Sequence, residues 1–121
     1  MMVVDTSVWL EIFLNQSLKK KCLHLIKRES CLVPSLCFFE VLKKVRFKIS
    51  DLEAMEVISA LKRFPVLDLT PEVALYAADL SHQHNLAMAD SIVLSHALTI
   101  KEELLTLDND FESIPHVKII R

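Results

Sequence analysis

The fold is decided by the first nine residues, Met1-Met2-Val3-Val4-Asp5-Thr6-Ser7-Val8-Trp9. The apolar residues 1–4 predict a buried strand, and the apolar spacing that begins at Ser7 predicts a helix. Asp5 lies between the two, at the point where the strand ends. Ligands of open parallel sheets bind beyond the carboxyl ends of the strands, so this carboxylate is a candidate for chemistry. Alternatively, Asp5 only caps the helix that follows it.

The remainder of the chain alternates apolar runs with helical patterns. Apolar runs that do not alternate with polar residues are typical of a parallel sheet covered on both faces. We therefore predict one domain over residues 1–121, with a three-layer α/β/α fold around a mostly parallel sheet of about five strands. The further strands are expected at 31–33, 66–69, 104–107 and 117–120, and helices at 7–14, 17–28, 35–48, 51–64, 70–84 and 89–97.

The composition excludes several classes of protein. The chain has no glycine, which rules out the glycine-rich phosphate loops of P-loop and dinucleotide-binding proteins. Asn15, Asn85 and Asn109 are then the residues expected at positive φ. Three cysteines make an odd count, typical of buried apolar residues in a reducing compartment. Charged residues interrupt every apolar run, so we expect a cytoplasmic protein without a membrane span.

Four acids have similar positions in the predicted fold. Asp5 follows the first strand and Asp108 follows the fourth, while Glu40 lies in the helix after the second strand and Asp90 opens a late helix. The carboxyl ends of parallel strands share one edge of the sheet, so these side chains can meet there. Carboxylates about 4 Å apart repel each other by roughly 4 kcal/mol at an effective dielectric near 20, so such a cluster favours a cation. Ligands that are all oxygen select Mg²⁺ or Mn²⁺.

Such ions can activate water for phosphodiester hydrolysis and neutralise the charge that develops on the phosphate. Each acid also has a structural alternative. Glu40 could form an ion pair with Lys43 or Lys44. Asp90 could cap its helix or interact with the helix dipole, and Asp108 and Asp110 could be turn residues. Spacing alone does not choose between these alternatives and a metal site.

Four motifs, taken in order, resemble those of PIN domains, and more narrowly the toxin ribonucleases of VapBC toxin–antitoxin pairs. They are Val3-Val4-Asp5-Thr6-Ser7-Val8-Trp9, Val33-Pro34-Ser35 leading to Phe39-Glu40-Val41, Ala87-Met88-Ala89-Asp90-Ser91-Ile92, and Leu105-Thr106-Leu107-Asp108-Asn109-Asp110-Phe111. The resemblance covers essentially the whole chain. It departs from the family pattern at Ser91, where alanine is common, and in the lack of glycine.

The resemblance implies a metal-dependent endoribonuclease. In that case Asp5, Glu40, Asp90 and Asp108 would be the catalytic residues and would bind Mg²⁺ or Mn²⁺. Asp110 would be an auxiliary ligand, and Thr6, Ser7 and Thr106 would support the acids through their hydroxyl groups. The resemblance also implies an RNA substrate, a homodimer and a cognate antitoxin whose C-terminal segment covers the active-site groove.

Basic side chains would then bind the RNA backbone. The group after Glu40, formed by Lys43, Lys44 and Arg46, is the candidate; a solvated helix face is the alternative. Trp9, Phe13, Phe38 and Phe39 have helical spacing and are expected in the core, and His96 is expected to be a core histidine with satisfied hydrogen bonds.

Two other functions remain open. The first is a catalytically inactive PIN-like module that binds RNA or protein, although all four acids are present. The second is a phosphohydrolase of the haloacid-dehalogenase type, in which a strand-end aspartate is the nucleophile. That family has a second aspartate two residues later, where this chain has Ser7, so this function fits less well.

Overall fold

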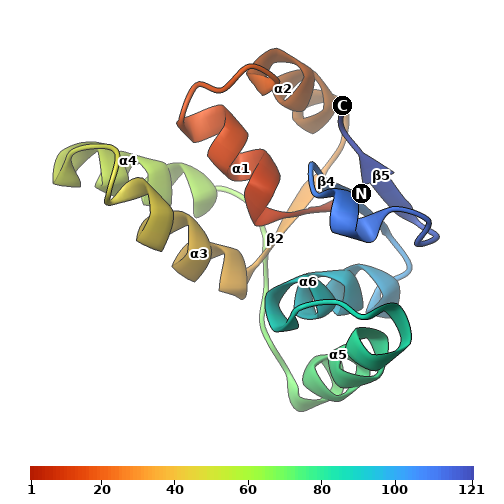
Figure 1. The fold of residues 1–121 in the computed structure, drawn as a ribbon. Coiled ribbons are helices and arrows are strands. Elements are labelled where there is room, and N and C mark those ends of the chain that lie inside the picture. Colours follow the sequence, from red (N-terminus) through yellow and green to blue (C-terminus); the bar gives the residue numbers. More distant parts are fainter.

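A computed structural model describes residues 1–121 and contains one five-stranded sheet. Its strand order is β3-β2-β1-β4-β5, and all four neighbouring pairs are parallel (Figure 1). The first strand is therefore the central one, with Val3 paired to Leu32 on one side and to Leu104 on the other. The strands are β1 Met2–Val4, β2 Cys31–Pro34, β3 Val66–Leu67, β4 Glu103–Thr106 and β5 Val117–Ile119.

Six α-helices cover the sheet and complete the predicted three-layer α/β/α fold. On one side of the sheet α1 packs against both α2 and α3, and α3 packs against α4, while α5 packs against α6 on the other side (Figure 1). This division follows from right-handed crossovers, because the chain steps from β1 to β3 in one direction and then crosses back to β4. The helices are α1 Thr6–Phe13, α2 Lys19–Arg28, α3 Ser35–Val45, α4 Asp51–Leu61, α5 Pro71–His84 and α6 Met88–Thr99, and a 3₁₀ turn η1 covers Asn109–Phe111.

The helix starts agree with the sequence where a side chain caps the backbone. The Ser50 hydroxyl accepts from the Glu53 N–H, and the Glu53 carboxylate accepts from the Ser50 N–H, which is a complete capping box. Thr70 accepts from the Val73 N–H at the start of α5. The helix ends are less accurate, since α3 stops at Val45 and α4 at Leu61, three residues earlier than expected.

Two of the three asparagines expected at positive φ have it, namely Asn15 (φ 53°) and Asn85 (φ 55°). The prediction for Asn109 is wrong, because the Asp108 carboxylate accepts from the Asp110 N–H and starts a right-handed 3₁₀ turn at Asn109. The other left-handed residues are Lys101, Ser113 and His116, in the connections before β4 and β5.

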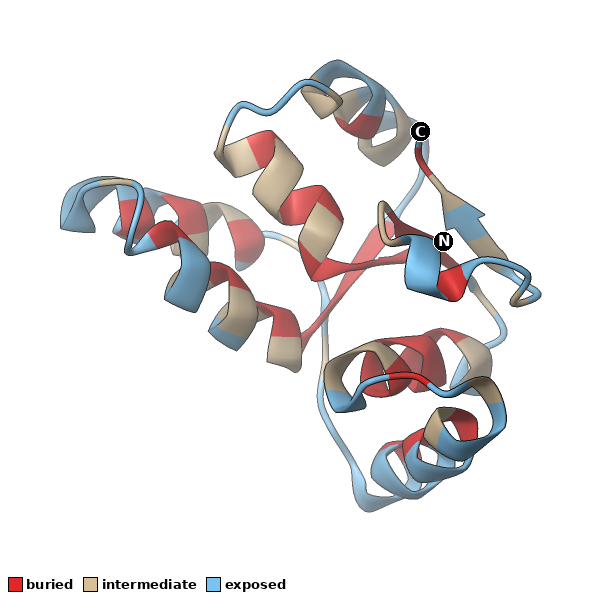
Figure 2. Ribbon diagram, in the orientation of Figure 1, coloured by how far each residue is buried: buried red, intermediate tan, exposed pale blue.

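The core lies between the sheet and its two helical layers, and the central strand is buried along its length (Figure 2). All three cysteines are free thiols in this interior, as expected from their odd count. Burial raises the pKa of the Cys22 thiol to about 11, so this group stays protonated. No helix has both the length and the apolar character needed to cross a membrane.

Candidate metal centre

The acids are positioned by the carboxyl edge of the sheet. Asp5 is the residue between β1 and α1, and Asp108 is the second residue after β4. Because β1 and β4 are parallel neighbours, both side chains reach the same edge. Glu40 comes from the second turn of α3, which follows β2 directly, and Asp90 is the third residue of α6.

Asp5 is buried and held by two hydroxyl groups. It is only 5% exposed, and its Oδ2 atom accepts hydrogen bonds from Ser7 Oγ (2.8 Å) and Thr106 Oγ1 (2.8 Å). Burial raises the pKa of Asp5, the two hydroxyl groups oppose that shift, and the charge of Glu40 adds to it. Both hydroxyls bind the same oxygen, which leaves Oδ1 without a hydroxyl partner.

The two hydroxyls also tie α1 to the end of β4. Ser7 Oγ accepts from the Leu107 N–H (3.0 Å), and Thr106 Oγ1 accepts from the Asp108 N–H (3.0 Å). Each hydroxyl thus donates to Asp5 and accepts from the backbone that leads to Asp108. This arrangement holds the Asp5 carboxylate and the Asp108 backbone in one rigid unit.

Glu40 is connected to the same unit through Thr6. The Thr6 Oγ1 atom donates to Glu40 Oε1 at 2.7 Å. Neither ion pair of the structure involves Glu40, since they join the N-terminus to Glu102 and Arg121 to Glu112. The alternative of an ion pair with Lys43 or Lys44 is therefore wrong: Lys43 lies instead over the Phe39 ring, and both lysines are exposed.

The tightest group of acids is Asp90, Asp108 and Asp110. One carboxylate oxygen from each lies within 4.8 Å of the others. Burial is the main cause that raises the pKa of Asp90 to about 7, and the charges of Asp5, Asp108, Asp110 and Glu40 contribute to this value in that order. The negative charges of all the other acids of the site therefore act on Asp90.

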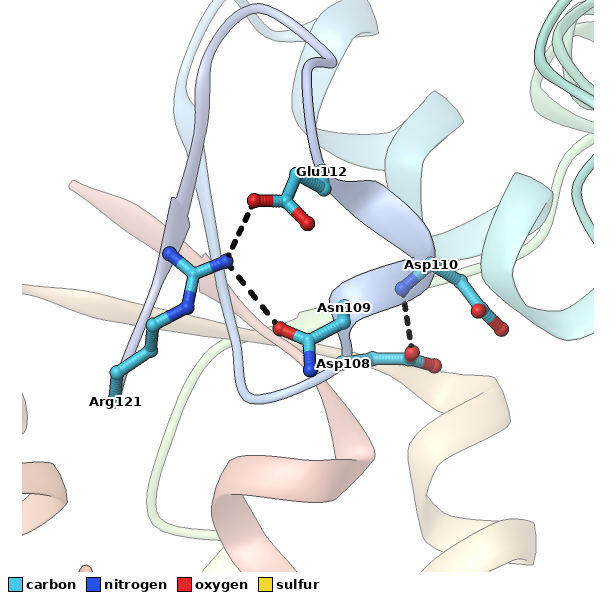
Figure 3. Close-up of polar contacts among 5 residues, drawn as sticks. All are labelled: Asp108, Asn109, Asp110, Glu112 and Arg121. Carbon is cyan, nitrogen blue, oxygen red and sulfur yellow. Dashed lines mark hydrogen bonds and ion pairs between the residues drawn. The ribbon is translucent and has the colours of Figure 1, made fainter.

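The turn after β4 presents Asp108 and Asp110 side by side. Asp108 Oδ1 accepts from the Asp110 N–H at 2.8 Å, so the turn brings both carboxylates to one side (Figure 3). The outer part of the turn is braced by the C-terminal residue, because Arg121 Nη2 donates to Glu112 Oε1 (3.0 Å) and Asn109 Oδ1 (3.4 Å). Sequence reasoning missed this contact of Arg121, for which the chain carries no local signal.

The capping alternatives are resolved in different ways. Asp5 occupies the N-cap position of α1, but its side chain makes no capping hydrogen bond, so the capping role is absent. Asp90 stands inside the first turn of α6, whose N-cap is Ala87. Asp108 does cap its 3₁₀ turn while its carboxylate faces Asp90 and Asp110. Helix α3 has Pro34 at its N-cap and starts without a capping hydrogen bond from a side chain.

The donor set fits a hard divalent cation. All candidate ligands are carboxylate oxygens, and no cysteine or histidine belongs to the group. Such donors suit Mg²⁺ or Mn²⁺ better than zinc. A cation would also relieve the repulsion that raises the pKa of Asp90.

The sequence profile of the PIN domain matches residues 2–117. The chain belongs to the PIN-domain family. No curated protein sequence matches it significantly. The match spans both Asp5 and Asp108, so the whole carboxyl edge described above is part of the PIN domain.

Solved structures share this PIN fold over their full length. A toxin–antitoxin complex from Klebsiella pneumoniae aligns with a TM-score of 0.85 at 19% identity, covering 98% of this chain and 96% of that one. A sarcin–ricin loop cleaving VapC toxin of Mycobacterium tuberculosis aligns with a TM-score of 0.84 at 13% identity, covering 98% of both chains. A promoter-bound VapBC complex from Rickettsia felis aligns with a TM-score of 0.78 at 16% identity, covering 99% and 98%. At these identities the likeness establishes the fold.

Trp9 is buried as expected. Lys43, Lys44 and Arg46 are exposed, which fits both RNA binding and a solvated helix face, so their role stays a prediction. Phe39 is not a core residue, because it is 63% exposed. His96 is buried at 3% exposure, but its Nε2 atom has no hydrogen-bond partner, so it is not a satisfied histidine.

Proposed function

We propose that this protein is a metal-dependent endoribonuclease and the toxin of a toxin–antitoxin pair. The observation that carries the proposal is the convergence of Asp90, Asp108 and Asp110 within 4.8 Å at the carboxyl edge of a PIN-domain sheet. Family membership supports nuclease activity. The RNA substrate and the metal ion are proposed in addition.

Asp5, Glu40, Asp90 and Asp108 would hold the ion, with Asp110 as an auxiliary ligand. A bound Mg²⁺ or Mn²⁺ would supply the activation of water and the neutralisation of charge that phosphodiester hydrolysis needs. The chain itself orients the carboxylates: Ser7 and Thr106 hold Asp5, and Thr6 holds Glu40. These hydroxyl contacts reduce the freedom that each carboxylate would lose on binding a cation.

The surroundings of the acids favour a polymeric substrate. Asp110 is exposed and Glu40, Asp90 and Asp108 are half-buried, so these four acids reach the surface while Asp5 lies beneath them. The large hollows of about 670 and 720 Å³ lie elsewhere, the first near His84 and His116 at the amino edge of the sheet and the second between α3 and α4. An open acidic site whose Glu40 is followed along α3 by Lys43 and Lys44 suits a nucleic-acid strand better than an enclosed small molecule.

The main experiment replaces single acids of the site by asparagine and measures RNA cleavage. We predict that Asp5→Asn and Asp90→Asn each lower Mn²⁺-dependent RNA cleavage by more than about 100-fold, since residues that merely orient metal ligands already cost about 10- to 100-fold. Asparagine can still accept the hydroxyl contacts of Asp5, so the fold, followed by near-ultraviolet circular dichroism, is expected to persist. Asp79→Asn, an exposed acid of α5, is the matched control and should cleave normally.

Undiminished metal-dependent cleavage by both variants would overturn the site assignment. Titration of Mg²⁺ and Mn²⁺ into the wild-type protein with RNA distinguishes the ribonuclease from the alternative, a catalytically inactive PIN-like module. A module that only binds RNA or protein shows no metal-dependent turnover on any RNA.

A homodimer and a cognate antitoxin are the proposed protein partners. The toxin–antitoxin complexes among the structural relatives support the antitoxin. The neighbouring reading frame tests this part of the proposal, since a small upstream gene that encodes a DNA-binding N-terminus is expected there. Sedimentation of the purified chain tests the homodimer, and a monomer at all concentrations would contradict it.

A further inference from the structure

Phe39 is an exposed aromatic residue immediately before an acid of the proposed centre. It is 63% exposed on α3, although its spacing predicted a core position. Single exposed apolar residues are common on protein surfaces, so exposure alone carries no meaning. Its position does, because Phe39 and Glu40 are adjacent and their Cα atoms are therefore about 3.8 Å apart.

The ammonium group of a lysine lies over the Phe39 ring. The Lys43 Nζ atom lies 5.7 Å from the centroid of the Phe39 ring, one helical turn further along α3. Lys44 and Arg46 follow on the same segment, and all three basic side chains are exposed. The part of α3 from Phe39 onward thus combines a flat apolar surface with positive charge.

This combination fits a nucleotide. Proteins bind unpaired bases by stacking them on aromatic rings and bind the connecting phosphates with basic side chains. A docked apolar peptide would instead need a continuous apolar groove. The hollow between α3 and α4 is lined by Leu42, Met55 and Ile58 among others, and Phe39 is not part of it.

We propose that Phe39 is a substrate-binding residue on whose ring an unpaired base of the RNA stacks, next to the phosphate that the acids address. Lys43 contacts the phosphate backbone of the same strand. This inference rests on the proposed ribonuclease function and adds that the substrate is single-stranded or looped at the cut. It also assigns specificity to shape and stacking, since every base has a face that can stack.

The test measures binding apart from cleavage. The probe is a fluorescein-labelled oligoadenylate of roughly twelve nucleotides, within the usual site size for single strands. A second oligomer has the same backbone length but no bases. Affinities are measured by anisotropy in Ca²⁺, which binds oxygen ligands, and gels verify that the probe stays intact. The variants are Phe39→Leu, which removes the ring, Phe39→Trp, which keeps one, and Phe47→Leu as control.

Phe47 is a matched control because it is 86% exposed and lies just beyond the end of α3. Eight residues of helix would separate it from Phe39 by roughly 12 Å. We expect Phe39→Leu to bind oligoadenylate about 5- to 150-fold more weakly, the range for loss of one stacked base. The base-free oligomer should bind equally to Phe39→Leu and wild type. Phe39→Trp and Phe47→Leu should resemble the wild type on both probes.

Three results would overturn the inference: wild-type affinity of Phe39→Leu for oligoadenylate, an equal loss on the base-free oligomer, or no binding of oligoadenylate by the wild type. The first of these would leave the ring available for contact with a protein partner. Cleavage in Mn²⁺ is read separately. A wild type that binds through Phe39 but cleaves no RNA contradicts the proposed function while the stacking inference stands.

Discussion

Asp90 experiences the strongest repulsion among the acids at the sheet edge. Burial and four neighbouring carboxylates raise its pKa to about 7. Above that pH the metal-free protein holds a carboxylate among like charges, which costs folding free energy. The arrangement that favours a cation therefore destabilises the protein when no cation is bound.

We predict that Asp90→Asn increases the free energy of unfolding of the metal-free protein. At about pH 8.5 the gain should be on the order of 1 kcal/mol, because solvent weakens the repulsion of half-buried charges. Urea denaturation in EDTA measures it. Added Mn²⁺ should then stabilise the wild type more than the variant, since binding to the native state shifts the unfolding equilibrium. A variant less stable than wild type in EDTA would contradict the repulsion.

His96 gives the second prediction at the residue scale. Burial lowers its pKa, and the charge of Asp68 opposes that shift. The unfolded chain binds a proton near pH 6.5 whereas the folded chain does not. Stability from the neutral histidine is therefore present above pH 6.5 and is lost as the pH falls through that value toward the lower folded pKa.

We expect the wild type to lose stability relative to His96→Phe as the pH is lowered from about 7.5 to 5.5. The relative free energy of unfolding should fall by at most about 1.4 kcal/mol per pH unit. Comparing the two proteins cancels the titration of Asp90, which is present in both. Urea denaturation at each pH provides the readout, with the exposed His24→Gln as control. A pH-independent difference between wild type and His96→Phe would be inconsistent with a buried neutral His96.

At the scale of elements, the end of α5 depends on one backbone conformation. Asn85 closes the helix at φ 55° and ψ 46°, and its N–H donates to the Ser81 carbonyl. Asparagine tolerates this left-handed region better than residues with a bulkier Cβ substituent, and glycine tolerates it best. The connection that follows leads directly to α6 and thus to Asp90.

Asn85→Ala should lower the free energy of unfolding by about 1 kcal/mol, whereas Asn85→Gly should leave it unchanged or raise it. Gln83→Ala, an exposed change in the last turn of the same helix, should shift it by less than about 0.5 kcal/mol. Thermal unfolding of the wild type and the three variants measures these differences in stability. Equal stabilities of the alanine and glycine variants would show that the left-handed conformation carries no cost.

At the scale of the whole molecule, the basic groups of α2 and α3 differ in their position relative to the acids. The chain has a net charge of −2, but Lys43 and Lys44 follow Glu40 on α3 by only three and four residues. Lys27 and Arg28 end α2, where the chain enters the amino end of β2, on the opposite edge. A nucleic acid bound at the acids should therefore use the α3 group and not the α2 group.

We predict that replacing Lys43 and Lys44 by alanine weakens RNA binding and makes it less dependent on salt. Two lost phosphate contacts should reduce the slope of log affinity against log salt by about 1.4 for a single strand, measured between about 50 and 200 mM KCl. Replacing Lys27 and Arg28 in the same way should leave the slope unchanged. Equal effects of the two double variants would indicate binding by net charge without a defined site.

Local sequence determined the class of the fold and the order of its elements. Apolar runs such as residues 2–4 and 104–106 are short, contain no alternation and are separated by helical patterns, which only a parallel sheet covered on both faces accommodates. Caps at Ser50 and Thr70 determined two helix starts, because they are satisfied by residues three positions away. Helix ends were less predictable, since they depend on packing and not on a local partner.

Only the tertiary structure decided how the acids are arranged. The sequence identified Asp5, Glu40, Asp90 and Asp108 by their places relative to the strands. It did not show that Asp90, Asp108 and Asp110 form a group with carboxylate oxygens within 4.8 Å of one another. The contacts of Asp5 with Thr106 and of Glu40 with Thr6 join residues 101 and 34 positions apart. Such contacts depend on which strands are neighbours, and the exposure of Phe39 depends on which face of α3 the core covers. Neither property has a local sequence signal.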